Sequence, residues 1–342
     1  MTREALRVTA TALMADDKGL LAMDESTSTC DRRFAAVGIP QTEDRRRAYR
    51  DLLITTPGLG DWISGAILCD ETFHQSSADG TPFPALLVRA GVIPGIKVDI
   101  GAKALAGHAG ETVTEGLDGL RDRLAGYAKM GACFAKWRAV FSPEPGCPSP
   151  ASIAANAHAL ARYGALCQEA GLVPIIEAEV LMDGDHDLAT CLAATRAALH
   201  GVFEDLFIQG VALEGMILKP NMVLPGLACA VQDSAEAVAD ATLGCLLESV
   251  PAVVPGIAFL SEGQSSILAS VRLNAISRAA VANGHTPWPL TFSFSRAVQR
   301  PALEIWRGDD SRRHAAQVAL IHRLRCNQAA RRGAYVEAME TA

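Results

Sequence analysis

Short apolar runs alternate with longer amphipathic segments along this chain of 342 residues. Uninterrupted runs rich in Ile, Val, Leu and Ala are typical of strands that are buried on both faces of a parallel sheet. Eight such runs occur, and we predict strands at residues 20–24, 65–69, 93–99, 132–138, 172–179, 216–219, 253–261 and 288–294.

The segments between these runs favour helices. Leu6, Ala10 and Leu13 recur at helical spacing within residues 2–18, which we expect to form a helix that ends at Gly19. The chain after residue 297 favours two or more terminal helices. Further helices are predicted at residues 43–53, 117–130, 152–170, 188–209, 235–248 and 265–283.

Eight repeated β-α units favour the α/β class and closure into a (β/α)₈ TIM barrel with additional terminal helices. An open dinucleotide-binding sheet has no support, because no Gly-x-Gly-x-x-Gly follows the first run. No long Pro/Ser-rich linker divides the chain, so we predict one domain over residues 1–342.

Composition narrows the possible classes of function. The chain is 49% hydrophobic, which excludes a disordered protein. A net charge of -7 argues against a nucleic-acid or anionic-membrane surface, and no apolar run is long enough to span a membrane. The nine cysteines include no Cys-x-x-Cys pair, and the first residues lack the apolar core of a signal peptide. We therefore expect a cytoplasmic protein.

Charged residues gather where the predicted strands end, which is where a TIM barrel builds its active site. Taken alone, each of them is more simply a surface charge, and Lys219 would be a solvated lysine at the start of a loop. Their joint occurrence favours a site that contains Asp24, Glu71, Lys97, Lys136, Arg138, Glu177, Glu179, Lys219, Ser261 and Arg296.

Lys219 is the candidate nucleophile of this site. A second cation nearby, Lys136, disfavours the ammonium form of Lys219 and favours an amine that attacks a carbonyl and forms a Schiff base. Glu177 or Glu179 on the intervening strand can supply the acid and base steps. The cationic imine accepts electrons, so that a carbon–carbon bond can break, and Asp24 is a candidate base for the hydroxyl proton that leaves.

Two groups of residues are suited to bind anions. The loops Ser261–Ser265 and Phe292–Arg296 follow the seventh and eighth strands, the usual phosphate site of a TIM barrel. The second group contains Lys97, Arg138, Ser26 and either Arg32 or Arg33. For Arg32 and Arg33, a solvated helix face is the alternative.

A substrate with a phosphate at each end fits these two groups. We expect no metal, because the eight histidines show neither His-x-His nor His-x-x-x-His spacing. Residues 183–187 lack the later glutamate of a calcium loop, and we expect no cofactor either.

Motifs in seven places, taken in order, resemble class I fructose-bisphosphate aldolase. The resemblance runs from about residue 5 to residue 310. The motifs are LLAMDEST at 20–27, GIKVD at 95–99, FAKWR at 134–138, PIIEAE at 174–179, LKPNMV at 218–223, FLS at 259–261 and FSFSR at 292–296.

The resemblance implies a metal-independent lyase of glycolysis and gluconeogenesis. Its substrate is fructose 1,6-bisphosphate, which it splits reversibly into dihydroxyacetone phosphate and glyceraldehyde 3-phosphate, usually as a cytosolic homotetramer. By the family pattern Lys219 is the Schiff-base lysine and Glu177 the main acid and base, supported by Glu179, Lys136 and Asp24. Contacts to the ketose and its phosphate are implied for Ser261, Gly263, Ser293, Arg296 and Arg33, and contacts to the second phosphate for Lys97 and Arg138.

Four features depart from the family pattern. Glu262 replaces the first glycine of Ser-Gly-Gly-Gln-Ser and adds a carboxylate beside a phosphate site. Ser295 stands where the family has glycine or alanine, so we expect a tighter turn or an added hydroxyl contact. Ala178 replaces a proline with little expected consequence. The chain ends at Ala342, without the longer tail of animal members, which puts any role of such a tail in doubt.

Two other functions are compatible with the sequence. Glu262 prompts a related sugar-phosphate lyase, or a transaldolase-like transferase, with altered substrate choice. Cleavage of the 1,6-bisphosphate compared with the 1-phosphate separates this alternative from the reaction of the family. A catalytically silent barrel that binds sugar phosphates or a protein partner is disfavoured, because every key position is intact.

Overall fold

The computed structural model describes residues 2–261 and 263–341, and in this part of the chain eight parallel strands close into a barrel. Their order is β1-β10-β9-β8-β7-β6-β3-β2, which confirms the predicted TIM-barrel class. The strands are β1 (Gly19–Met23), β2 (Ile63–Leu68), β3 (Ile93–Lys97), β6 (Phe134–Phe141), β7 (Val173–Val180), β8 (Ile217–Pro220), β9 (Ile257–Phe259) and β10 (Leu290–Phe294).

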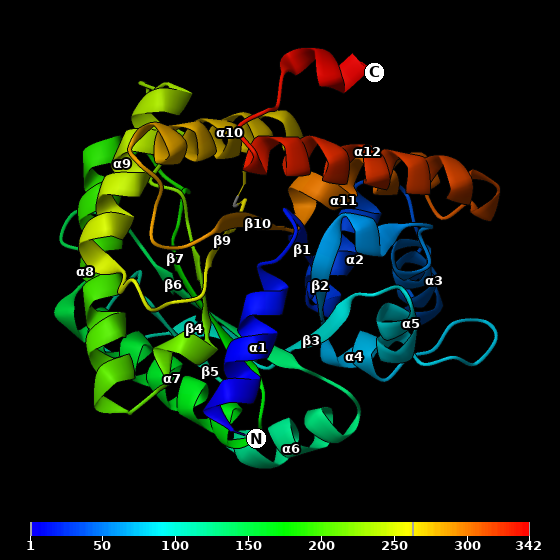
Figure 1. Ribbon diagram of the computed structural model, residues 1–342, viewed down its shortest axis with the longest axis horizontal. Helices are drawn as coiled ribbons and strands as arrows, with labels where there is room; N and C mark the ends of the chain where they lie inside the picture. Colours follow the sequence, from blue (N-terminus) through cyan, green and yellow to red (C-terminus); the bar gives the residue numbers. More distant parts are fainter. Residues whose placement is uncertain (1, 262, 342) are drawn as a thin grey trace.

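Helices surround the barrel, and Figure 1 shows α12 running beside α10 and α11 on one side of it. The α-helices are α1 (Arg3–Leu13), α2 (Thr27–Ala35), α3 (Glu43–Ile54), α4 (Asp70–Phe73), α5 (Phe83–Arg89), α6 (Leu120–Lys129), α7 (Pro150–Glu169), α8 (Leu188–Ile208), α9 (Ala235–Ser249), α10 (Ser266–Ala282), α11 (Arg296–Trp306) and α12 (Arg313–Arg331). Short 3₁₀ turns are η1 (Leu59–Asp61), η2 (Leu213–Gly215), η3 (Asp310–Arg312) and η4 (Glu337–Thr341). No helix among the described residues is both long enough and apolar enough to cross a membrane.

Two predicted boundaries were wrong for local backbone reasons. The first helix ends at Leu13 rather than at residue 18, because Asp16 and Asp17 adopt left-handed conformations with φ of 54° and 58°. The seventh strand begins only at Ile257, since Pro255 cannot donate a hydrogen bond to a neighbouring strand.

A small antiparallel hairpin after β3 was not predicted. Its strands are β4 (Gly101–Ala104) and β5 (Thr112–Glu115), and they pair with each other rather than with the barrel. Most of β4 is exposed, so the alternation of apolar and polar residues that announces a half-buried strand is missing. The hairpin flanks the carboxyl end of the barrel, where its first residues border the cavity described below.

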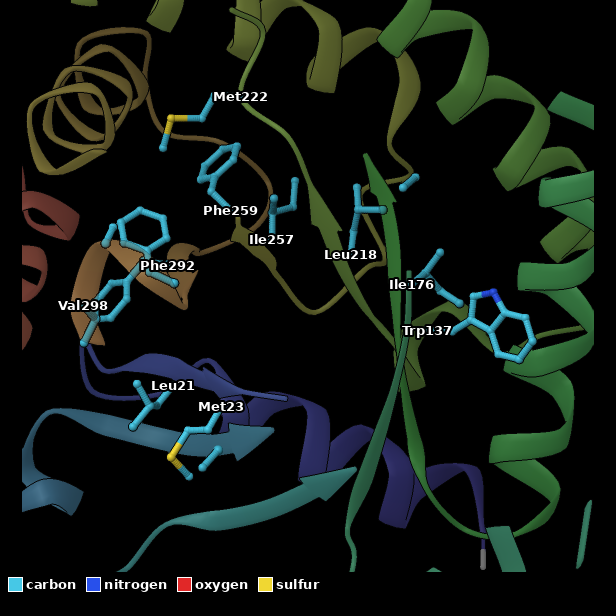
Figure 2. Packing of buried hydrophobic residues seen from close by; sticks show 14 of the residues in the cluster. Leu21, Met23, Trp137, Ile176, Leu218, Met222, Ile257, Phe259, Phe292 and Val298 are labelled. Carbon is cyan, nitrogen blue, oxygen red and sulfur yellow. The ribbon is translucent and has the colours of Figure 1, made fainter. Parts of the chain in front are cut away.

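Side chains alternate between the two faces of each barrel strand. Trp137, Ile176 and Leu218 pack in the layer between the strands and the helices, where Figure 2 shows them. The Trp137 ring lies 5.5 Å from the ring of Tyr163 on α7. Each of the three is adjacent in sequence to a charged residue, which consequently faces the inside of the barrel.

The inside of the barrel is apolar below this charged layer. Phe134, Ile175 and Ile217 each lie two residues before a charged residue, and they pack in one cluster with Leu13 of α1. The helix α1 therefore closes the amino-terminal end of the barrel. Gly95 leaves room for the Phe134 ring, because a Cβ atom at this position would overlap the ring.

Candidate active site

A cavity of about 520 Å³ opens at the carboxyl ends of the barrel strands. Among the described residues, Gly263 is the one predicted phosphate or Schiff-base residue that does not line the cavity. The N–H group of Gly263 donates to Met182 Sδ at 2.8 Å. The cavity brings together Asp24, Ser26, Arg33, Lys97, Lys136, Arg138, Glu177, Glu179, Lys219, Ser261, Ser293 and Arg296.

Two lysines share one carboxylate at the bottom of the cavity. Glu177 and Lys219 are partners in the β7–β8 register, and the Lys219 Nζ lies 3.0 Å from Glu177 Oε1. The Lys136 Nζ lies 2.9 Å from Glu177 Oε2 and 2.7 Å from Asp24 Oδ2. All four side chains are less than one-tenth exposed, so Lys219 is not a solvated surface lysine.

Opposite charges hold Asp24, Glu177 and Lys136 in their ionised forms. Burial alone favours a neutral carboxyl group, but the ammonium groups of Lys136 and Lys219 outweigh it and lower the pKa of Asp24 and of Glu177. Burial also favours a neutral Lys136, but Asp24 and Glu177 together raise its pKa above the usual lysine value. Lys136 is therefore a permanent cation between two anions near neutral pH.

A second ion-paired group lies beside the first, on β3, β6 and β7. The Lys97 Nζ lies 2.7 Å from Asp99 Oδ1, and the Arg138 Nε lies 2.5 Å from Glu179 Oε2. Asp99 also accepts the backbone N–H of Arg138 at 3.2 Å, so this carboxylate links the Lys97 ammonium group to the backbone of β6. The side chains of Lys97 and Arg138 are 20% and 40% exposed, and this group can therefore meet an anion at the rim.

The carboxyl ends of β9 and β10 form a third part of the cavity. Ser261 and Ser293 are both buried, and the Ser293 Oγ has no hydrogen-bond partner among the described residues. A buried hydroxyl without a partner is unfavourable, and it indicates that a ligand group completes it. The helices α10 and α11 both begin here, next to Arg296. Glu262, the residue that departs from the family pattern, lies outside the described residues.

The structure distinguishes Arg33 from Arg32, and it places Glu71 outside the cavity. Arg33 lines the cavity, whereas Arg32 is exposed and donates to Thr29 Oγ1 at 3.1 Å. Glu71, which we placed with the strand-end group, binds the Arg46 guanidinium at 2.7 Å and is not among the described residues that line the cavity. The reason is that α4 begins directly after β2 and carries Glu71 away from the barrel axis.

Glu25 is a site residue that reasoning from the sequence missed. Its side chain is only 5% exposed, and its two oxygens lie 2.5 Å from Arg33 and 2.6 Å from Arg50. Burial opposes ionisation, but Arg50 and Arg33 outweigh it and lower the pKa of Glu25 to about 2. The signal available in the sequence was its place directly after Asp24 in the first motif.

Away from the cavity, one described group has residue types that bind metals. His322, Cys326 and Glu340 have their ligand atoms within 4.8 Å of one another. The Glu340 carboxylate, however, lies 2.5 Å from the Arg323 guanidinium, and Tyr335 donates to it at 2.8 Å. With a cation already bound to this carboxylate, we assign the group to packing of the C-terminal segment against α12.

The sequence profile of the family described as fructose-bisphosphate aldolase class-I matches residues 5–342. The chain belongs to this family. A probable fructose-bisphosphate aldolase class 1 of Xanthomonas campestris pv. campestris is 53% identical to it, over 94% of this chain and 95% of the relative. Fructose-bisphosphate aldolase 2 of Caenorhabditis elegans is 46% identical, over 97% of this chain and 90% of the relative.

A solved aldolase structure has the same fold. The fructose-bisphosphate aldolase of Plasmodium falciparum, crystallised in complex with TRAP and a small-molecule inhibitor, superposes with a TM-score of 0.94. Its sequence is 44% identical, and the match covers 97% of this chain and 95% of that chain. The resemblance seen in the sequence is confirmed, and the activity of the class follows: reversible cleavage of fructose 1,6-bisphosphate through a lysine Schiff base, in glycolysis.

Proposed function

We propose that Lys219 is the Schiff-base lysine of this aldolase and that Glu177 is its main acid and base. The observation that carries the proposal is the 3.0 Å contact between Lys219 Nζ and Glu177 Oε1 inside the cavity. Glu179 is the weaker candidate, because Arg138 already holds its carboxylate at 2.5 Å. In this arrangement Glu179 keeps the Arg138 guanidinium in place.

The first half of the reaction forms the imine. Glu177 accepts a proton from the Lys219 ammonium group, and the free amine attacks the carbonyl carbon of the ketose. Glu177 then returns the proton to the carbinolamine hydroxyl, which leaves as water. The Lys136 cation, 2.9 Å from Glu177, stabilises the carboxylate form of Glu177 before the first transfer and after the second.

The second half breaks the carbon–carbon bond. Electrons of the bond between C3 and C4 move into the cationic imine and leave an enamine on Lys219, while the hydroxyl on C4 loses its proton and becomes the aldehyde of glyceraldehyde 3-phosphate. Asp24 is the proposed base for this proton, with Lys136 at 2.7 Å to stabilise the developing charge. Protonation of the enamine at C3 and hydrolysis of the imine then release dihydroxyacetone phosphate.

The two phosphates fit the two ends of the cavity. For the phosphate of the ketose end we propose the carboxyl ends of β9 and β10, where a buried hydroxyl lacks a partner among the described residues. The residues there are Ser261, Gly263, Ser293, Arg296 and Arg33, with Ser26 on the adjoining wall. For the second phosphate we propose Lys97 and Arg138, whose cationic ends reach the rim.

We also propose that residues 1–342 form one domain and that the protein is a cytoplasmic homotetramer. The family supports this proposal, and one Arabidopsis thaliana relative that is 48% identical is described as cytosolic. Large apolar side chains at the end of α8, Phe207 and Ile208, are 81% and 66% exposed and would suit a subunit contact. Light scattering should give four times the chain mass of 36.0 kDa, and a monomer mass at micromolar concentration would contradict the tetramer.

Reductive trapping tests the assignment of Lys219. Borohydride with dihydroxyacetone phosphate should inactivate the protein and leave one covalent adduct, located by peptide mass spectrometry on Lys219. Lys219→Arg keeps the charge and should lose both adduct and activity, whereas Lys129→Arg, exposed at the end of α6, should retain both. An adduct on a different lysine, or activity abolished by EDTA, would overturn the proposal.

A further inference from the structure

Ser295 lies between β10 and α11 and is the N-cap residue of α11, but its side chain makes no capping hydrogen bond. Its Oγ lies 3.2 Å from both Nη1 and Nη2 of Arg33, a residue more than 260 positions earlier in the chain. The same Oγ lies 2.5 Å from Glu25 Oε1. The hydroxyl therefore joins a carboxylate and a guanidinium at the wall of the cavity.

The direction of these hydrogen bonds follows from counting protons. A serine hydroxyl has one proton to donate and two lone pairs, whereas an ionised carboxylate only accepts and a guanidinium only donates. Glu25 is ionised over the physiological range, because Arg50 and Arg33 lower its pKa against the effect of burial. The proton of Ser295 is therefore given to Glu25, and its lone pairs accept from Arg33. No proton is left for an anion in the cavity.

Arg33 is thus held by two acceptors on one side. Its Nη1 donates to Glu25 at 2.5 Å and to Ser295, and its Nη2 donates to Ser295. Glu25 is itself fixed, since Gln299 Nε2 donates to it at 2.9 Å and Arg50 binds its other oxygen. The Glu25 carboxylate faces the guanidinium groups of Arg33 and Arg50, so these three side chains together carry a net positive charge.

Arg33 also lies near Arg296, the cation at the start of α11. Partial burial, together with the positive charge of Arg33, lowers the pKa of Arg296. Two guanidinium groups at one cavity wall are typical of an anion site, because both can donate hydrogen bonds to the same phosphate. A rigid Arg33 would meet that anion without first losing side-chain freedom.

We propose that Ser295 is a positioning residue whose side chain holds the Arg33 guanidinium in place for the ketose phosphate and whose hydroxyl does not donate to the phosphate. The inference rests on the proposed function of this cavity. Ser295 stands where the family has glycine or alanine. Its hydroxyl gives Arg33 an additional hydrogen-bond acceptor and does not give the substrate an additional donor. A chain with glycine or alanine here would leave Glu25 as the side-chain acceptor for Arg33 among the described residues.

Steady-state kinetics of Ser295→Ala tests this role. Loss of the acceptor should raise the KM for fructose 1,6-bisphosphate about three- to tenfold, the usual effect of one or two hydrogen bonds, and should change kcat less than about twofold. Ser295→Thr keeps the hydroxyl and should restore the KM. Ser311→Ala is the matched control, because it removes a serine hydroxyl 2.7 Å from the Asp309 carboxylate on the turn between α11 and α12.

A double-mutant cycle separates positioning from direct contact. Arg33→Ala should raise the KM more than Ser295→Ala does, and adding Ser295→Ala to it should raise the KM no further. Equal effects of Ser295→Ala with and without Arg33 would overturn the inference, as would an unchanged KM in the single variant.

Borohydride trapping on Lys219, measured for each variant, tests the proposed function of the cavity separately from the proposed role of Ser295. Wild-type protein that forms no adduct would overturn the proposed function of the cavity. An adduct in all variants with an unaltered KM would overturn only the role of Ser295.

Discussion

Lys136 and Lys219 are both buried lysines at strand ends, but they have different partners. Lys136 contacts two carboxylates, at 2.7 and 2.9 Å, whereas the ion pair that Lys219 makes is with Glu177, at 3.0 Å. The carboxylate that Lys219 contacts is the one it shares with Lys136. Under the proposed mechanism, the lysine with two carboxylate partners stays a cation and the lysine with one acts as the nucleophile.

The candidate residues at the strand ends could be predicted because lysine and glutamate inside apolar runs are unusual. Glu25 and its partner Arg50 could not be predicted. Arg50 is 2% exposed, yet the helix that carries it also contains Arg45, Arg46 and Arg47, and nothing in the sequence shows which of the four pairs with Glu25. Only the packing of α3 against the barrel selects it.

The charge of Glu25 should make stability depend on pH. The pKa of Glu25 is about 2, below its usual value of 4.5, because Arg50 and Arg33 outweigh burial. A carboxyl group whose pKa falls on folding stabilises the protein above the unfolded pKa, and this contribution is lost as the pH falls towards the folded pKa. Glu25→Gln should reduce the free energy of unfolding at pH 7 by on the order of 2–3 kcal/mol.

Urea unfolding of wild-type protein and Glu25→Gln at several pH values measures this contribution. The difference between the two proteins should shrink as the pH falls from about 4.5 towards 2. A difference that stays constant from pH 7 to pH 2 would contradict the assignment of a buried carboxylate at this position.

At the scale of elements, each of β6, β7 and β8 carries an apolar residue two positions before a charged one. Phe134, Ile175 and Ile217 form the apolar floor, and the charged residues that follow them form the layer above. A charged layer on an apolar floor has no water below it, so its charges must pair with one another. The site therefore requires the floor to be closely packed.

Gly95 on β3 tests this packing. Gly95→Ala would place a methyl group inside the contact distance of the Phe134 ring, and it should destabilise the protein by about 1–3 kcal/mol through overpacking. Combining it with Phe134→Leu should recover part of the loss. Denaturant midpoints provide the measurement.

A matched glycine is available on α6. Gly126 has no described heavy atom within 4 Å of the position that an added methyl group would occupy, and Gly126→Ala should raise stability by about 0.5–1 kcal/mol. Equal effects of the two substitutions would show that Gly95 is not needed for packing of the floor.

At the scale of the whole molecule, barrel closure places β1 and β6, with β2 and β3 between them, around one cavity. Asp24 follows β1 and Lys136 lies on β6, yet their charged atoms are 2.7 Å apart. The C-terminal segment is held elsewhere: Glu340 in η4 binds Arg323 of α12 at 2.5 Å. The end of the described chain is thus anchored on the outer helices.

This anchor should contribute to global stability. Arg323 is 3% exposed, and Glu340→Gln would leave its guanidinium without this carboxylate, which should lower the free energy of unfolding by about 2–3 kcal/mol. Glu304→Gln removes a carboxylate from the exposed Arg300 pair on α11 and should have little effect. Thermal unfolding of both variants checks the contrast, and equal melting temperatures would rule out the anchor.

The sequence by itself determined the barrel class, the order of its elements and the types of residue at the strand ends. Strands buried on both faces are necessarily apolar, so their runs, and the charges that interrupt them, are visible without a structure. Tertiary structure alone decided which charges meet. The pairing of Glu25 with Arg50 and the contact of Ser295 with Arg33 depend on closure of the barrel, which joins residues far apart in the chain through distances that no local pattern encodes.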